Sequence, residues 1–263
     1  MALSSSAVAS VALRIDAETF EAETGGGDPT SQLVQELQAR IRGMQRTKLD
    51  TRALPTNPAL GGLLPDGALA AGSVYAVDNS TTLALGLVQG PSAAGAWCAV
   101  VGVPDLGVEA AAGLGIDLER LVLVPHPGEH WLSVVSALID VVSVVLVKPP
   151  MSGQAGQQAR ARIGEAAAGK LAARLRQREA VLVSLGDWPR ADARLTVTES
   201  NWAGIGAGFG HLTARQVTVS STARSWAGRT RSRRLWLPGP DQRLEAVTAR
   251  TSEVAPALRS IAG

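Results

Sequence analysis

Residues Gly72–Leu85 read Gly-Ser-Val-Tyr-Ala-Val-Asp-Asn-Ser-Thr-Thr-Leu-Ala-Leu, a short apolar run, a polar turn and a second apolar run. The first run predicts a buried strand over residues 73–77, and the hydroxyl residues predict the start of a helix over residues 81–87. Unbroken aliphatic runs of this kind recur along the chain. They are typical of a parallel sheet that is covered by helices on both faces. We therefore predict an α/β fold.

The same patterns place the remaining elements. Further strands are expected at residues 97–103, 121–124, 141–147 and 180–185, and helices at residues 106–112, 129–139 and 158–178. After residue 190, the runs at 195–198, 216–220 and 235–237 predict antiparallel strands at the C-terminal end of the sheet. The glycine-rich segment 202–210 is interpreted as a flexible linker between two of them.

Charge and composition divide the chain into four parts. Residues 1–29 have a net charge of −4 and predict a flexible acidic arm, and residues 30–54 predict an N-terminal helix and linker. Residues 55–240 form the predicted core with its C-terminal hairpin, and residues 241–263 a weakly ordered tail. Residues 211–263 have a net charge of +6, which favours a polyanion or an acidic protein as partner.

Several classes of protein are disfavoured by composition. The chain is 46% hydrophobic, which suits a buried core, and its single cysteine, Cys98, allows no intrachain disulfide. No apolar run reaches the roughly 18 residues of a membrane helix, and no basic segment precedes the first apolar residues. We expect a cytoplasmic protein without a membrane contact. His126 and His130 are separated by a Pro-Gly turn, so no metal site is predicted.

The order of these motifs resembles the ATPase core of the RecA family. The resemblance rests on Leu60-Gly-Gly-Leu-Leu-Pro-Asp-Gly67, on Gly72-Ser-Val-Tyr-Ala76 and on Thr81-Thr-Leu-Ala-Leu85, and it covers roughly residues 55–240. It implies a RecA-like core in which a phosphate loop lies between the strand at 73–77 and the following helix. It also implies a glutamate after the strand at 97–103 and a magnesium-binding aspartate after the strand at 141–147.

The residues at the phosphate-loop position depart from that family. The segment consists of Asp78, Asn79, Ser80, Thr81 and Thr82, without the glycines and the lysine that wrap and reach phosphates. At about 4 Å and an effective dielectric of about 20, each Asp–phosphate charge pair opposes binding by about 4 kcal/mol. The two threonines are interpreted as a helix N-cap. This degenerate loop predicts that no nucleotide cofactor is bound.

Two further positions lack the expected chemistry. Lys148 stands where the resemblance places the magnesium-binding aspartate, and a cation cannot hold a divalent metal. We interpret Lys148 as solvated or paired with Asp78; the alternative is that it replaces the missing phosphate-loop lysine. Asp105 is the acidic residue nearest to the expected glutamate, and it lies out of register. We therefore predict a protein that is not an enzyme.

The segments that match the DNA-binding loops of the RecA family are short. Residues 151–157 are uncharged, and only residues 186–193 separate the next two strands. Trp188 in the second segment either stacks on a base or covers the end of the sheet.

An arginine-rich segment offers a different binding surface. Residues 224–234 contain five arginines, and two tryptophans lie among or just after them. The candidate partner-binding residues are Arg224, Trp226, Arg229, Arg231, Arg233, Arg234 and Trp236. Such a segment suits a nucleic-acid backbone or an acidic protein groove, and its structural alternative is a solvated hairpin tip.

Among RecA-like proteins without nucleotide chemistry, the sequence is most similar to the ImuA-prime family. Size, the degenerate phosphate loop and the arginine-rich segment carry this resemblance. It implies an accessory role in damage-induced, error-prone translesion synthesis, with nucleoid association after damage. The implied partners are an ImuB-type Y-family-like polymerase adaptor and, indirectly, an error-prone replicative-type polymerase. The alternatives are a DNA-binding recombination mediator and a RecA-type ATPase whose phosphate site uses Lys148 and Thr81.

Overall fold

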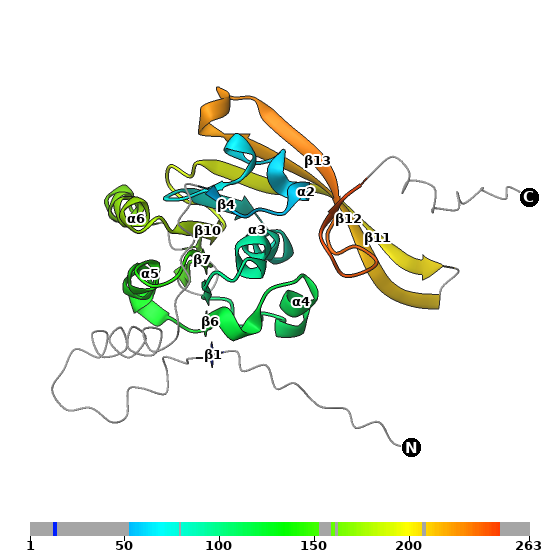
Figure 1. Ribbon diagram of the computed structural model, residues 1–263, viewed down its shortest axis with the longest axis horizontal. Coiled ribbons are helices and arrows are strands. Elements are labelled where there is room, and N and C mark those ends of the chain that lie inside the picture. Colours follow the sequence, from blue (N-terminus) through cyan, green and yellow to red (C-terminus); the bar gives the residue numbers. More distant parts are fainter. Residues whose placement is uncertain are drawn as a thin grey trace, which may run out of the picture.

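The computed structural model describes residues 13–14, 53–78, 80–152, 159–160, 163–206 and 209–247. They form a mixed α/β fold around a ten-stranded sheet with the order β1-β6-β5-β7-β10-β4-β11-β12-β13-β14 (Figure 1). Apart from strand β1 (Leu13–Arg14), the predicted acidic arm lies outside the described residues, and so does the helix expected after residue 30.

The parallel half of the sheet confirms the prediction from the aliphatic runs. Every residue of its strands is buried except the last residue of β4. These strands are β4 (Val74–Asp78), β5 (Cys98–Val101), β6 (Leu121–Val124), β7 (Val144–Val147) and β10 (Val181–Leu185). All of their pairings with one another are parallel.

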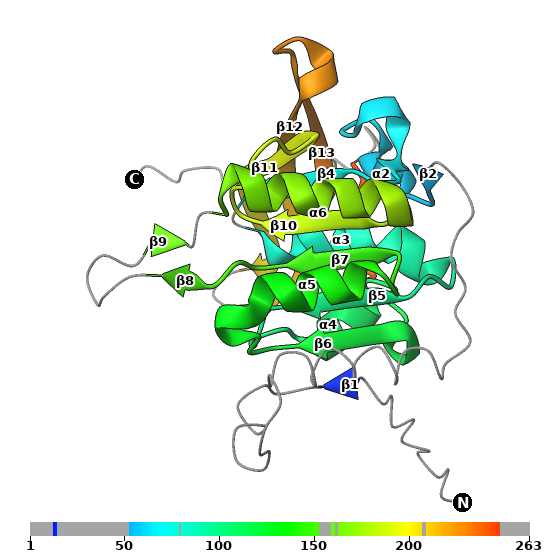
Figure 2. The ribbon, with the colours of Figure 1, turned by 90° about the vertical axis from the view of Figure 1, so that its left-hand side faces the viewer.

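Helices cover both faces of this half. Helices α3 (Thr81–Ala93) and α4 (Val108–Gly113) pack on one face, and α5 (Trp131–Ile139) and α6 (Glu165–Arg178) on the other (Figures 1 and 2). Successive strand residues alternate between the two cores, as the pleat requires: Leu146 contributes to the α3 side and Val145 to the α5 and α6 side.

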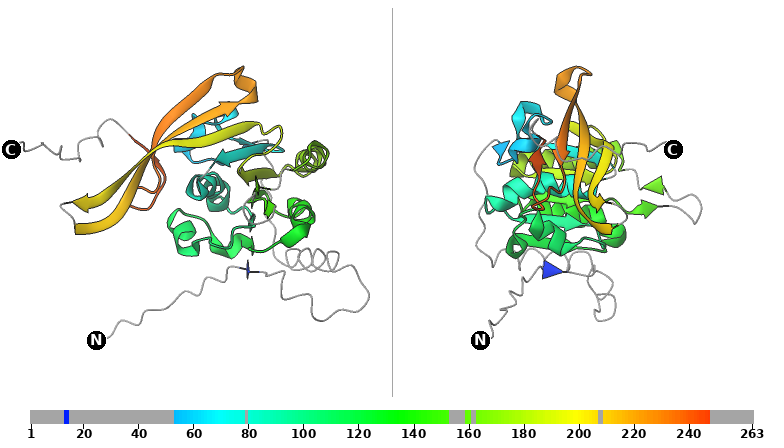
Figure 3. Two further views of the ribbon diagram at one scale, coloured as in Figure 1. Left: turned by 180° about the vertical axis from the view of Figure 1, so that it is seen from behind. Right: turned by 90° about the vertical axis from the view of Figure 1, so that its right-hand side faces the viewer.

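Four strands extend the sheet beyond β4. They are β11 (Ala193–Gly206), β12 (Phe209–Ala223), β13 (Thr230–Trp236) and β14 (Glu245–Ala246), and successive members pair antiparallel. Strand β11 pairs parallel with β4, and Thr196 lies opposite Asp78 at the end of β4. The rest of β11 therefore runs past β4, and the β11–β12 hairpin projects from the body of the molecule (Figure 3).

The interpretation of residues 202–210 as a flexible linker is wrong for its described part. Trp202 pairs with Arg215 and Gly206 with Phe209, so the segment forms the end of the hairpin. Gly204 has a φ of +113°, and a Cβ there would lie 2.1 Å from the His211 carbonyl oxygen. Glycine therefore serves a β-bulge with a close backbone approach.

The smaller elements connect these layers. They are β2 (Ala53–Leu54), α2 (Pro58–Gly61), the 3₁₀ turns Pro65–Gly67, Leu118–Arg120, Gly128–His130 and Arg224–Trp226, and the strands β3 (Leu69–Ala70), β8 (Met151–Ser152) and β9 (Ala159–Arg160). Strand β2 pairs with β3, and β8 pairs with β9.

Several predicted boundaries differ from the structure. The helix expected over residues 158–178 begins at Glu165, because Gly164 is extended and residues 159–160 belong to β9. Helix α3 runs past residue 87 to Ala93, where it packs against the segment at Pro55. Residues 241–247 do not fit the weakly ordered tail expected from residue 241, since Leu244 is buried and β14 pairs with β13.

None of the helices in the described part of the chain is long and apolar enough to span a bilayer.

Asp140 joins the two helices on one face of the sheet. It follows the last residue of α5, and its carboxylate accepts hydrogen bonds from Arg174 Nε at 2.8 Å and Arg178 Nε at 3.1 Å, both on α6. Burial raises the pKa of Asp140, but these bonds and charges outweigh burial and hold the pKa below its ordinary value of 3.8. The folded protein therefore binds this proton less tightly than the unfolded chain does.

We expect Asp140→Asn to lower the free energy of unfolding by about 1 kcal/mol at pH 7. Because the folded-state pKa is depressed, this stabilisation is present above 3.8 and is lost as the pH falls through the folded-state pKa. Urea unfolding of both proteins between pH 7 and pH 3 measures the difference. A difference that stays constant over that range would contradict the assignment.

Candidate functional site

The first candidate site lies at the carboxyl ends of β4 and β10, where the sequence predicted a degenerate phosphate loop. The Asp78 carboxylate accepts hydrogen bonds from Arg194 Nη1 at 2.9 and 3.2 Å and from Thr196 Oγ1 at 3.0 Å. Arg194 Nη2 donates to Asp187, in the loop after β10. These four residues form the strand-end cluster, which joins β4, β10 and β11.

The one cation of this cluster is already paired. Burial lowers the pKa of Arg194, but the hydrogen bond to Asp187 and the charge of Asp78 outweigh it and raise the pKa above its ordinary value. The guanidinium therefore stays charged and is shared by two carboxylates. The cluster has a formal charge of −1, so it offers no free cation to a polyphosphate.

Ser80 caps helix α3. Its Oγ accepts a hydrogen bond from the backbone N–H of Leu83 at 3.2 Å, and its extended backbone suits an N-cap residue. The prediction that Thr81 and Thr82 cap the helix is therefore wrong, since both lie inside its first turn.

The connection between β4 and α3 is too short for a phosphate cradle. Strand β4 ends at Asp78 and α3 begins at Thr81, which leaves only Asn79 and Ser80 between them. Asn79 itself lies outside the described residues. A phosphate cradle uses several consecutive backbone N–H groups of a glycine-rich loop, and Ser80 already occupies the N–H of Leu83.

Lys148 and Asp105 lie elsewhere along the strand ends. Lys148 follows β7, is half-buried and donates its backbone N–H to Val101 at 2.9 Å. The interpretation that it pairs with Asp78 is wrong, because Asp78 pairs with Arg194. Strand β10 separates β7 from β4 in the sheet. Asp105 is exposed in the turn after β5.

Trp188 covers the end of the sheet, one of its two predicted roles. It is 2% exposed, and its ring meets that of Trp131 edge to face, with centroids 6.5 Å apart. A buried ring cannot stack on a base. Of the other candidate DNA loop, residues 153–157 lie outside the described residues.

The second candidate site is the arginine-rich hairpin, residues 224–236, which comprises the turn after β12 and strand β13. Its five arginines are exposed and its two tryptophans are half-buried. The hairpin predicted for this segment is confirmed, with Arg224–Trp226 as a 3₁₀ turn between the paired strands.

Several of these side chains have partners within the molecule. Arg233 Nη1 donates to the carbonyls of Pro58 and Ala59 in α2, at 3.3 and 3.1 Å. The guanidinium of Arg231 lies 4.1 Å from the ring centroid of Trp226, a cation–π contact. Arg224, Arg229, Arg234 and Trp236 complete the predicted set, and Arg224 Nη1 donates to the Arg190 carbonyl at 3.4 Å.

The strand-end cluster and the turn of the arginine-rich hairpin lie toward opposite ends of the strands. Ala223, at the end of β12, is opposite Ala193, which in turn is opposite Tyr75 near the start of β4. The turn at residues 224–229 therefore lies toward the amino end of β4, whereas the strand-end cluster lies at its carboxyl end. The structure does not bring the predicted phosphate-loop and partner-binding residues together.

One exposed feature was missed by sequence reasoning. Trp202 and Leu212, on the projecting hairpin, are 49% and 52% exposed, and they are the exposed large hydrophobic side chains of the described residues. The Arg215 guanidinium lies 5.5 Å from the Trp202 ring centroid across the strand pair. The glycines around Trp202 interrupt the alternating pattern by which a strand, and a solvent-facing Trp202 on it, could have been predicted.

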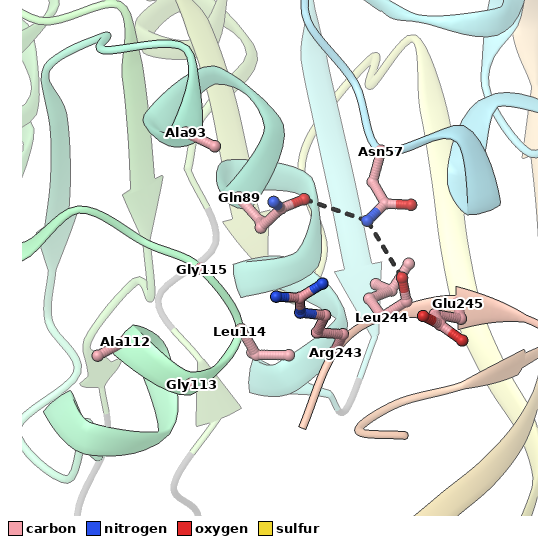
Figure 4. A pocket seen from close by; sticks show the side chains of 10 residues that line it. All are labelled: Asn57, Gln89, Ala93, Ala112, Gly113, Leu114, Gly115, Arg243, Leu244 and Glu245. Atoms are coloured by element: carbon pink, nitrogen blue, oxygen red, sulfur yellow. Dashed lines mark hydrogen bonds between the residues drawn. The ribbon is translucent and has the colours of Figure 1, made fainter. Parts of the chain in front are cut away.

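A cavity of about 380 Å³ lies between α3, α4 and the segment before β14 (Figure 4). Asn57 at its rim caps α2 by accepting from Ala59 N–H, and it donates to Gln89 Oε1 at 3.1 Å and to the Leu244 carbonyl at 3.2 Å. Through these bonds, Asn57 connects α2, α3 and the C-terminal segment. The exposed side chains of Arg243 and Glu245 complete the polar lining.

The potentially reactive side chains offer little chemistry. Among the described residues, no three His, Cys, Asp or Glu side chains are grouped closely enough to hold a metal ion. Cys98 is fully buried in β5, and burial raises the pKa of its thiol to about 12. It is therefore a small apolar core residue, as predicted, and not a nucleophile at neutral pH.

The chain thus has a mixed α/β fold with a mostly parallel sheet and antiparallel strands toward its C-terminus. Residues 62–190 match the family model of the MT3502 N-terminal domain. A 138-residue stretch, 51% of the chain, is 36% identical to the uncharacterized protein Rv3395c of Mycobacterium tuberculosis. That stretch spans 63% of the relative, less than two thirds of its length. The family match includes β4–β10 and ends before the arginine-rich hairpin.

The strand-end cluster generates a prediction about stability. We expect Asp78→Ala to lower the free energy of unfolding by about 1 kcal/mol, because Arg194 and Thr196 lose their shared acceptor. Arg194→Ala should cost a similar amount. The double variant should cost less than the sum, since the two side chains interact directly. Chemical denaturation of the four proteins measures this coupling, and strictly additive effects would contradict the cluster.

Proposed function

We propose that this chain is a non-catalytic, RecA-like accessory protein in DNA-damage-induced, error-prone translesion synthesis. It acts by binding an ImuB-type Y-family-like adaptor and, through it, an error-prone replicative-type polymerase. The strand-end cluster carries the proposal. Where a RecA-like ATPase needs a glycine-rich cradle and free cations, Asp78 instead accepts hydrogen bonds from Arg194 and Thr196.

The arrangement of the sheet supports a RecA-like core. A central parallel sheet flanked by helices is followed by antiparallel strands at its C-terminal end, which is the order that the resemblance implies. The exposed arginine-rich hairpin supports a docking role, because it provides cations on a rigid strand pair that the core anchors.

Nucleotide binding separates this proposal from the ATPase alternative. We expect a fluorescent ATP analogue with Mg²⁺ to show no saturable binding below about 1 mM, because the carboxyl end of β4 lacks both a glycine-rich phosphate loop and an unpaired cation. Equilibrium dialysis of the full chain measures this. Micromolar binding that is lost on Lys148→Ala would overturn the proposal in favour of the ATPase.

The docking role is tested by charge reversal on the arginine-rich hairpin. Arg229→Glu combined with Arg234→Glu should reduce co-purification with an ImuB-type protein at least about tenfold, as expected for the loss of attractive charge pairs at an interface. The control is Lys170→Glu, which makes the same charge change at one exposed residue of α6. Point variants are preferred to truncation, because Leu195 and Leu235 of the C-terminal strands belong to the core.

The same variants test the recombination-mediator alternative, which the five exposed arginines favour. A fluorescent single-stranded oligonucleotide is titrated with the full chain at several salt concentrations. Tight binding that weakens steeply with salt and disappears in the double variant, together with unchanged co-purification, would replace the adaptor by a DNA-binding mediator.

A further inference from the structure

Strand β13 has an outer edge that is only partly paired. Strand β14 pairs with Leu235 and Trp236, and the N–H of Val247 donates to the Arg234 carbonyl at 3.1 Å. Beyond that bond, no strand among the described residues lies along the outer side of β13. The open edge, as we define it, comprises residues 230–233.

The direction of the backbone groups at this edge follows from the antiparallel pattern. The N–H of Leu237 donates inward to Arg215 of β12, and the carbonyl of Arg234 accepts from the outer side. Alternate residues of an antiparallel strand bond to opposite neighbours. Ser232 and Thr230 therefore direct their backbone N–H and C=O groups outward, where they can pair with another extended chain.

The charged side chains of residues 224–236 are all positive. Residues 224–236 contain five arginines and no acidic residue. Arg233 is held by the carbonyls of α2 and Arg231 by the ring of Trp226. Arg229 and Arg234 are exposed and form no ion pair with another described residue. Their charges are available to an incoming acidic chain.

The chain's own residues after Val247 are poor occupants of this edge. Ala246 stands opposite Leu235, and continuing that register would set Arg250 opposite Arg231. Like charges directly opposite each other on paired strands are destabilising. An occupant that supplies acidic side chains at these positions has the complementary charge.

We propose that the open edge of β13 binds an acidic, extended segment of a partner protein as an additional antiparallel strand. The backbone of Ser232 and Thr230 provides the ladder bonds, and Arg229 and Arg234 attract the acidic side chains. This inference deepens the proposed docking role and rests on it for the identity of the partner. A peptide fits better than single-stranded nucleic acid, because an alternating row of donors and acceptors matches another peptide backbone. One face of Trp226 is, moreover, already covered by Arg231.

The test uses the full chain and a fluorescein-labelled octapeptide in which Glu and Val alternate. Fluorescence anisotropy should show saturable binding, whereas the Lys–Val peptide of the same length should bind at least tenfold more weakly. Two further probes carry backbone N-methyl groups at all Glu residues or at all Val residues. At least one of them should lose tenfold or more in affinity, because its methylated amides face β13 and can no longer donate.

Variants of the protein locate the binding to this edge. Ser232→Pro removes an outward N–H without removing a bond to β12, since proline is tolerated at such edge positions. It should weaken peptide binding at least tenfold, and thermal unfolding verifies that the fold is retained. Arg229→Glu with Arg234→Glu should have a similar effect, and Lys170→Glu should have none. Should Ser232→Pro not fold, the methylated peptides still decide the question.

The outcomes separate this inference from the proposed function. Equal binding of the parent and both methylated peptides would overturn strand addition, because charge alone would then explain the affinity. An oligonucleotide that binds at the same edge more tightly than the Glu–Val peptide would likewise overturn it in favour of nucleic acid. If the Glu–Val peptide does not bind while co-purification with an ImuB-type protein still depends on Arg229 and Arg234, strand addition is wrong and the docking role is retained. If the peptide binds but no ImuB-type protein co-purifies, strand addition at β13 is retained and the proposed identity of the partner is wrong.

Discussion

The hydrogen-bonded ion pair between Asp78 and Arg194 is the interaction on which the placement of the C-terminal strands depends. It connects the last residue of the central parallel strand to the first strand of the antiparallel extension. A residue at the carboxyl end of a central strand is where α/β proteins usually meet their ligands. Here Asp78 forms a structural ion pair with Arg194, which attaches β11 to β4. The strand-end cluster therefore contains no unpaired cation.

The consequence is a molecule whose available charge lies elsewhere. The one cation of the strand-end cluster is shared by two carboxylates, whereas the arginine-rich hairpin, which includes the third strand from β4, presents exposed cations. Electrostatic attraction of a polyanion or an acidic protein is therefore directed to the C-terminal strands. This distribution of charge is the observation on which the proposed docking role rests.

Sequence patterns predicted the parallel half of the sheet well, because its strands are aliphatic throughout and each is buried on both faces. They found parts of β11 and β12, at residues 195–198 and 216–220, but missed the full length of these strands, because Gly204 serves a bulge inside a long strand. The partner of Asp78 could not be predicted either. Arg194 is distant in sequence, and only the parallel pairing of β11 with β4 brings it beside Asp78.

A strand as basic as β13 needs strong anchors, and the alternation of its side chains supplies them. Leu235 is fully buried in the core, and Arg233, two residues earlier on the same face, donates to the carbonyls of α2. Arg234 lies on the opposite face, so its charge is not forced against the apolar core. The inward backbone bonds to β12 hold the strand, and the outward groups of Ser232 have no strand partner among the described residues. The bonds that attach the arginines to the sheet thus use only the inward backbone groups, and the outward groups are the ones that the proposed partner strand would pair with.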